Sequence, residues 1–294
     1  MARPGRGRYT GYLLLAPGAI WLALFFVIPF YSLVSASLFD PNGSVLTGYK
    51  MTYHFANFGT AIRLYHSELF RSLWYAGLAT LICLVIGYVL AYAIAFKAGK
   101  WRNLLLVLVI APFFTSFLLR TLSWKLILAD HGFVVSTLHN LHILGALHQL
   151  GILDSDGRLL NTWVAVVAGI VYNFLPFMVL PLYASLEKID GRLLEAAGDL
   201  YANPFTTFFK VTWPLSLPGV VAGTLLTFIP AAGDYINAQL LGSPSGRMVG
   251  NVIQSLFTTT QDYAGAGALS VILMAIIVGL VLAYIRKAGT EDLV

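Results

Sequence analysis

The sequence predicts an all-α integral membrane protein with about six transmembrane helices. Of its 294 residues, 58% are hydrophobic and only 11% are charged, against roughly 25% charged residues in an ordinary soluble domain. Such a chain has too few polar side chains to cover its surface in water. Six apolar runs are long enough to cross a hydrocarbon core of about 30 Å, which takes roughly 20 helical residues.

Each of these runs is expected to be a helix, because lipid offers no hydrogen-bonding partner to backbone N–H and C=O groups. Barrel strands would instead show about 10 residues of alternating polarity. The predicted spans are residues 12–38, 72–96, 103–119, 162–186, 216–241 and 264–285. The first run is longer than the core of a signal peptide, so we expect a retained span, kinked at Pro29.

Lys and Arg residues predict the orientation. One side of the membrane collects its basic residues in mostly short segments: Arg3, Arg6, Arg8, Lys97, Lys100, Arg102, Lys188, Arg192, Lys210, Arg286 and Lys287. The other side spreads its basic residues through two longer loops, which weigh less in the positive-inside rule. We therefore expect both termini in the cytoplasm, with cytoplasmic segments 1–11 and 286–294 flanking one transmembrane domain, residues 12–285.

Several function classes are disfavoured by what the sequence lacks. The net charge of +5 follows from membrane orientation, and no basic stripe with interleaved aromatics suggests a nucleic-acid partner. Cys83 is the only cysteine, and the six histidines lack HExxH spacing, so no metal site is expected. No arrangement of nucleophile and base supports a membrane enzyme, so we name no catalytic residue. Without a GxxxxGK[ST] motif the chain has no phosphate-binding loop for ATP.

One predicted cytoplasmic loop, residues 187–215, has the signals of two short helices. Asp190 is suited to cap the first helix, and Asn203 followed by Pro204 is a start signal for the second. The loop is apolar enough for two interpretations. It is either an amphipathic element lying on lipid headgroups, or a surface that docks an apolar helix face into a groove of another protein.

The same loop resembles the coupling loop of binding-protein-dependent ABC importer permeases. Glu195, Ala196 and Ala197 stand where that family has its Glu-Ala-Ala signature, and Val211, Trp213 and Pro214 fall where it usually has Ile, Leu and Pro. Tyr201 departs from the pattern, because the family usually has Gly there; a Gly appears earlier, at Gly198. The departure falls at the expected turn between the two predicted helices, where Asn203 and Pro204 offer a substitute break.

Within that family, the chain is most similar to the first permease of spermidine/putrescine importers. The resemblance extends over most of the chain. Its main segments are residues 171–187, residues 112–116 with Arg120, Thr121 and Trp124, and residues 228–230 with Gly233 and Asp234.

The resemblance implies a subunit of a bacterial inner-membrane importer. It implies a heterodimer with a second permease, two copies of an ATPase that binds ATP and Mg, and an external substrate-binding protein, with no cofactor in this chain. It also implies which residues couple ATP use to transport: Glu195, Ala196, Ala197, Gly198, Leu200, Tyr201 and Pro214.

Polar and aromatic residues at membrane depth are the expected substrate path. Asp234 is the first candidate, because an ionised carboxylate in a span costs several kcal/mol unless it faces a partner or water. A polyamine would supply ammonium groups as that partner. Tyr235 offers a cation–π face, and the weaker candidates are Tyr172, Asn173 and Trp124. Alternatively, Asp234 pairs with a basic residue of the second permease or lies near the outer interface.

Basic and proline residues of the spans also have expected roles. Arg120 and Lys125 are expected where the third span emerges outside, gripping headgroups or the binding protein. Pro176, Pro181 and Pro230 are candidate hinges.

The sequence also allows other functions. The cargo could instead be thiamine, iron or a sugar phosphate, and a secondary transporter is less favoured because no internal repeat is evident.

Overall fold

The computed structural model describes residues 7–44, 46–141, 145, 152–154 and 156–288, and these residues are helical apart from loops and two isolated β-bridges. The predicted all-α class is therefore confirmed. Five helices in this part of the chain are long and apolar enough to cross a membrane: Tyr12–Ala36, Ala56–Lys97, Trp163–Leu186, Pro204–Ala232 and Tyr263–Lys287. A sixth candidate is a bent pair of helices. Residues 1–6 and 289–294, which make up much of the expected cytoplasmic ends, lie outside the described residues.

The chain divides into two compact units, one of which holds the residues up to 66 together with residues 253–275. In it, α1 (Gly7–Leu22), a π-helical turn (Ala23–Val27) and α2 (Ile28–Ala36) form the first span. The widened turn ends two residues before Pro29, where a kink was expected. Gly267 of α14 (Tyr263–Ala288) packs so closely that a Cβ there would lie 2.7 Å from the backbone nitrogen of Ser37.

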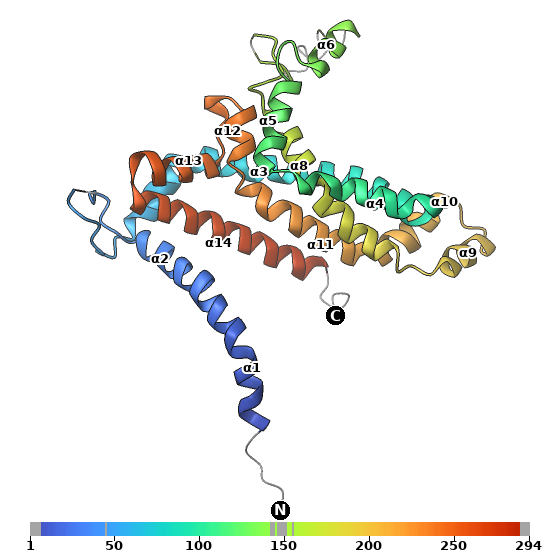
Figure 1. Cartoon of the computed structure of the whole chain (residues 1–294), viewed down its shortest axis with the longest axis horizontal. Coiled ribbons are helices and arrows are strands. Elements are labelled where there is room, and N and C mark those ends of the chain that lie inside the picture. The colour runs from blue at the N-terminus through green and yellow to red at the C-terminus, as the bar shows by residue number, and fades with distance from the viewer. Residues whose placement is uncertain (1–6, 45, 142–144, 146–151, 155, 289–294) are drawn as a thin grey trace, which may run out of the picture. The chain divides into compact units, whose positions relative to one another are not determined.

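The second unit, residues 67–252 and 276 onward, is built around α8 (Trp163–Leu186) and α11 (Trp213–Ala232), which lie side by side (Figure 1). Small residues allow the contact: a Cβ on Gly219 would lie 2.6 Å from the carbonyl oxygen of Pro181. Such close backbone approach is typical of helix pairs in membranes, where lipid and side chains are equally apolar. Both helices remain helical across their internal prolines.

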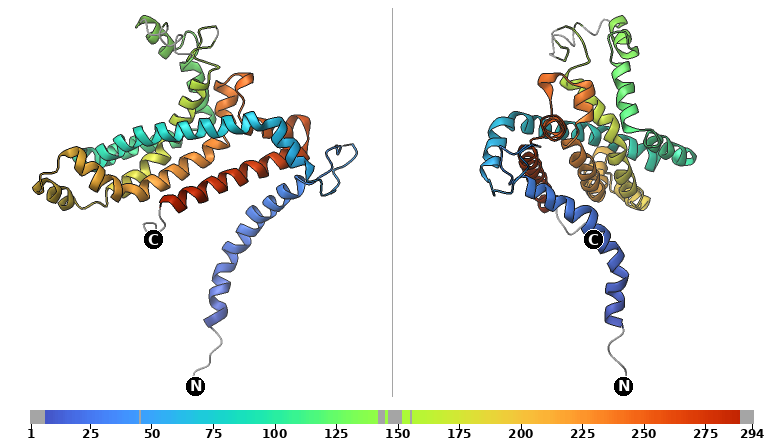
Figure 2. Two further views of the ribbon diagram at one scale, coloured as in Figure 1. Left: turned by 180° about the vertical axis from the view of Figure 1, so that it is seen from behind. Right: turned by 60° about the vertical axis from the view of Figure 1, so that its left-hand side comes forward.

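The third predicted span is broken, which corrects the expectation of a continuous helix over residues 103–119. A helix from Gly99 to Phe114, which includes α4 (Arg102–Ile110), meets α5 (Phe117–Ile127) at 95° (Figure 2). Thr115 has extended backbone angles, and both its backbone N–H and its hydroxyl donate to the carbonyl oxygen of Pro112. These local bonds replace the helical pattern and turn the chain.

Two further boundaries differ from the prediction. The second span belongs to α3 (Ala56–Tyr92), which begins 16 residues before residue 72 and continues as a π-helical turn to Lys97. The fifth span runs from Pro204 to Ala232, whereas residues 216–241 were predicted. It ends at Gly233, after which α12 (Ile236–Leu241) starts anew. Other short helices include α6 (Phe133–Asn140) and α13 (Val249–Ser255).

Candidate functional sites

The first candidate site is α9 (Gly191–Asp199), a short helix between the fourth and fifth spans. The Asp190 side chain accepts a hydrogen bond from the backbone N–H of Arg192 at 3.0 Å, which confirms the predicted cap. Ala197 is the buried residue of α9. The helix packs against α10 (Pro204–Thr207) and the π-helical turn Phe208–Thr212 that follows it.

The turn after α9 shows how the chain accommodates Tyr201, at the position where the resemblance led us to expect Gly. Tyr201 has φ = 58°, in the left-handed region that favours glycine. Its N–H donates to the carbonyl oxygen of Gly198 at 2.9 Å, and the N–H of Ala202 donates to that of Ala197 at 3.0 Å. The glycine-type conformation is therefore kept at this position, and Gly198 stays within α9.

The second predicted short helix is the first turn of the fifth span, which corrects the expectation of a separate element. Asn203 caps it, since its side-chain oxygen accepts from the N–H of Thr206 at 2.8 Å, and Pro204 takes the first helical position as predicted. The helix then continues through the π-helical turn into α11, with Pro214 in the first turn of α11. Movement of α9 would thus act directly on the start of the fifth span.

The outer face of α9 carries polar and apolar groups without partners in the described chain. Glu195 and Ala196 are exposed, and Glu195 makes no hydrogen bond or ion pair with a described residue. Leu200 is 81% exposed and Tyr201 98% exposed. Beside α9 lies an open cavity of about 660 Å³ between α8 and α11. Its lining residues are Pro181, Ala184, Ser185, Lys188, Ile189, Asp190, Leu193, Leu215, Pro218, Gly219 and Ala222.

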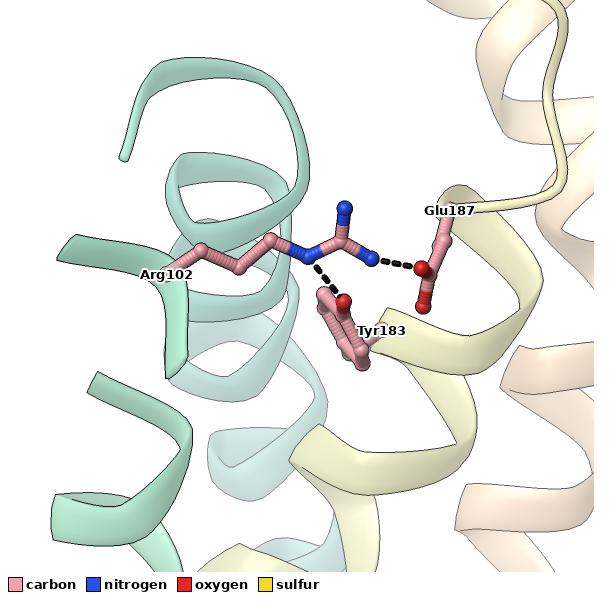
Figure 3. A network of polar contacts seen from close by, with 3 residues as sticks. All are labelled: Arg102, Tyr183 and Glu187. Atoms are coloured by element: carbon pink, nitrogen blue, oxygen red, sulfur yellow. Dashed lines mark hydrogen bonds and ion pairs between the residues drawn. The ribbon is translucent and has the colours of Figure 1, made fainter. Parts of the chain in front are cut away.

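A cluster of three side chains ties α4 to the end of α8, close to α9 (Figure 3). Arg102, the first residue of α4, forms an ion pair with Glu187 and donates a hydrogen bond to the hydroxyl of Tyr183. Its guanidinium carbon also lies 5.0 Å from the centre of the Tyr183 ring. Glu187 caps the C-terminus of α8, so this cluster joins the third span to the segment that leads into α9.

The second candidate site is a buried polar network between α5, α8 and α12. The side-chain amide of Asn173 donates to the hydroxyl of Thr121 and to the side-chain oxygen of Asn237, both at 3.2 Å. Thr121 is also 3.3 Å from that oxygen of Asn237. The side-chain oxygen of Asn173 is buried without a donor. Thr121 and Asn237 were not predicted as site residues.

Asp234 belongs to this network and lies beyond the end of the apolar span Pro204–Ala232. One carboxylate oxygen accepts from the backbone N–H groups of Ile236 and Asn237, at 2.9 and 3.1 Å, and the other accepts from the Asn237 side chain. Asp234 thus starts α12 and holds it to α5 and α8.

The three aromatic candidates lie apart from the carboxylate's hydrogen bonds. The rings of Trp124 and Tyr172 meet edge to face, with centres 5.6 Å apart. Tyr235 is 40% exposed, and its carbonyl oxygen accepts from the side chain of Asn251 at 2.7 Å. The structure therefore joins Asn173 to Asp234 through Asn237, and pairs Trp124 with Tyr172. No cluster of three potential metal ligands occurs among the described residues.

Comparisons with known proteins agree with this architecture. The profile of the family described as "Binding-protein-dependent transport system inner membrane component" matches residues 83–288. The chain is 40% identical over 267 residues to the spermidine/putrescine transport system permease protein PotB of Haemophilus influenzae, covering 90% of each chain. It is 38% identical over 270 residues to PotB of Escherichia coli, covering 92% of this chain and 94% of the relative.

Solved structures support the fold. The chain is similar to a chain in the crystal structure of a bacterial ABC transporter involved in the import of the acidic polysaccharide alginate. The TM-score is 0.69 at 18% sequence identity, and the match covers 95% of both chains. At this identity the likeness concerns the fold alone.

Proposed function

Because this chain belongs to the family of binding-protein-dependent inner membrane transport components, we propose that it moves polyamines, such as spermidine or putrescine, into the cytoplasm. It is a multi-pass permease subunit of an ATP-binding-cassette importer. The observation that carries the proposed cargo is the 40% identity, over 90% of both chains, to a permease named for spermidine and putrescine.

Side-chain chemistry supports a cationic cargo. The unpaired side-chain oxygen of Asn173 needs a donor, and an ammonium group carries three. Asp234, which is linked to Asn173 through Asn237, adds negative charge to the same network. The aromatic faces of Trp124, Tyr172 and Tyr235 suit cations passing nearby. Rearrangement of α12 would open the network to cargo, since Asp234 now bonds within the chain.

The remaining partners follow from the same proposal. A second permease would complete the pore, two ATPase subunits would bind ATP and Mg, and an external binding protein would deliver cargo. This chain would then be non-catalytic, with both termini in the cytoplasm. The exposed apolar side chains of α9 suit a groove on the ATPase, and the free carboxylate of Glu195 suits a charge-assisted hydrogen bond there.

The proposed coupling path begins at α9 and has two branches. Contact at Glu195, Ala196 and Leu200 would move α9 when the ATPase pair closes on ATP. One branch runs forward through the turn at Tyr201 to the start of the fifth span and Pro214. The other runs back through Glu187 to Arg102 and the third span.

The cargo proposal is tested by uptake of labelled spermidine into vesicles that contain the assembled importer. We expect Asp234→Asn to lower uptake at least about tenfold, because the neutral amide cannot attract an ammonium group. Asp262→Asn is the matched control, since Asp262 also caps a helix, accepting from the N–H of Gly265 at 2.8 Å. Uptake by the control should match the parent.

Two outcomes would contradict parts of the proposal. Unchanged uptake in the Asp234→Asn importer would remove the substrate role of Asp234. If the parent importer accumulates no polyamine, and its ATP hydrolysis responds instead to another small solute, the proposed cargo is wrong.

A further inference from the structure

Arg120 is a buried cation with no acidic partner among the described residues. Its side chain lies on α5, and the residue is 9% exposed. Its Nε and Nη1 atoms are fully buried and have no hydrogen-bond acceptor, and it forms no ion pair with a described residue. Buried charges in proteins are normally paired, because an isolated one costs several kcal/mol of lost hydration.

Aromatic rings surround the guanidinium group. Its central carbon lies 5.5 Å from the centre of the Phe113 ring and 5.6 Å from that of Phe117. These rings contact Phe177 and Phe174 of α8, with centres 4.8 and 6.0 Å apart. Ring faces attract the positive charge, but they cannot accept the hydrogen bonds of the buried N–H groups.

The position of Arg120 along the span limits the choice of partner. Its neighbour Thr121 is hydrogen-bonded to Asn173 at 3.2 Å, and Asn173 and Phe174 lie halfway along the 24-residue helix α8. At about 1.5 Å per residue, they are roughly 17 Å from either end of the span. Arg120 therefore lies beside the middle of the α8 span, whereas the sequence led us to expect it where the third span emerges outside.

That depth excludes the two partners expected from the sequence. Lipid headgroups lie about 15 Å from the midplane, and an external protein lies farther still. A polyamine cargo, on which this step rests, carries the same charge as Arg120 and would be repelled. The carboxylate of Asp234 already accepts hydrogen bonds from Ile236 and Asn237, so a charged acceptor must come from another membrane-embedded chain.

We propose that Arg120 is an assembly anchor, which pairs with a carboxylate side chain that the second permease places near the middle of the membrane. A carboxylate supplies both the charge and the two acceptors that Nε and Nη1 lack, in the bidentate geometry that guanidinium favours. Phe113 and Phe117 are only partly buried, so an incoming side chain can reach the guanidinium past their rings. The surrounding rings would then shield the ion pair from lipid.

The experiment uses Arg120→Met, which keeps the length of the side chain and removes its charge. In the full chain purified alone, we expect a higher thermal unfolding temperature, because an uncompensated charge is lost. In the importer purified through a tag on this chain, we expect at least about tenfold less of the second permease, because its carboxylate loses its partner. Opposite effects on the free chain and on the assembly distinguish an anchor from a residue needed for folding.

Lys125→Met is the matched control, since Lys125 is an exposed cation on the same helix, and it should change neither quantity. Charge exchange identifies the partner: Arg120→Glu should lose the second permease, and one Asp→Lys or Glu→Lys change in the second permease should restore it. The proposal is overturned if Arg120→Met retains the second permease fully, if it destabilises the free chain, or if no exchange restores assembly. Assembly is measured without cargo, so a wrong cargo assignment would leave this result unchanged.

Discussion

Tyr201 shows how a single residue can keep a backbone conformation that its side chain disfavours. Left-handed backbone costs a residue with a Cβ about 1–2 kcal/mol, and the φ of 58° at Tyr201 lies in that region. Tyr201 is 98% exposed, so packing against the described residues of this chain does not offset that cost. A fully exposed tyrosine in this conformation suits contact of its ring with another subunit.

Tyr201→Gly should therefore stabilise the isolated chain by about 1 kcal/mol, seen as a higher thermal unfolding temperature in detergent. ATP-driven uptake by the assembled importer should fall, because the exposed ring is lost. Tyr201→Ala is the control, since it removes the ring but keeps the Cβ and its strain. Equal unfolding temperatures for the Gly and Ala variants would show that the strain argument is wrong.

Helix caps could be predicted from the sequence, whereas the buried polar network could not. Asp190 and Asn203 act on backbone groups two or three residues away, so their chemistry is visible locally. Asn173 meets Thr121 and Asn237 across 52 and 64 residues of sequence, and only the packing of three helices brings them together. The spacing of Asp234 and Asn237, three residues apart at a helix start, was the one local signal available for Asn237.

At the scale of elements, hydropathy located the spans but missed the bend in the third. The segment around Pro112 and Thr115 is apolar, so it continues the run although its backbone turns by 95°. The same bend brings Arg120 beside the middle of α8 instead of at the outer end of a straight helix. Likewise, the sequence marked the helix start at Pro204 but not its continuity with the fifth span, which runs on through a π-helical turn over Phe208–Thr212.

The cluster of Arg102, Tyr183 and Glu187 is the element-scale link between α4 and the segment before α9. Arg102→Glu should weaken coupling, because two carboxylates would then face each other at this contact. We expect ATP hydrolysis that no longer rises with cargo, together with at least about threefold lower uptake, as befits a partly exposed ion pair worth up to about 1 kcal/mol.

The reversed pair, Arg102→Glu with Glu187→Arg, restores the attraction and should recover most of the coupling. Cargo-stimulated ATP hydrolysis and uptake are measured together in the single and double variants. A double variant no better than Arg102→Glu alone would show that the ion pair does not carry the coupling.

For the whole molecule, the account depends on α9 being a contact surface for an ATPase. The helix joins the fourth and fifth spans and packs against the start of the fifth, with Glu195 and Ala196 exposed and Ala197 buried. The alternative from the sequence, in which this segment lies on lipid headgroups, uses the same exposed apolar side chains. Composition cannot separate the two, because both environments bury apolar surface.

The most direct measurement is cross-linking from a cysteine at position 196, in a chain whose buried Cys83 is replaced by alanine. In the intact importer, Ala196→Cys should cross-link to the ATP-hydrolysing subunit, and the cross-linked particle should lose ATP-driven uptake. Ala197→Cys, at the buried neighbouring position, should give little product. An Ala196→Cys chain that forms no adduct with an ATPase, and whose label at that position is quenched by headgroup probes, would contradict the account.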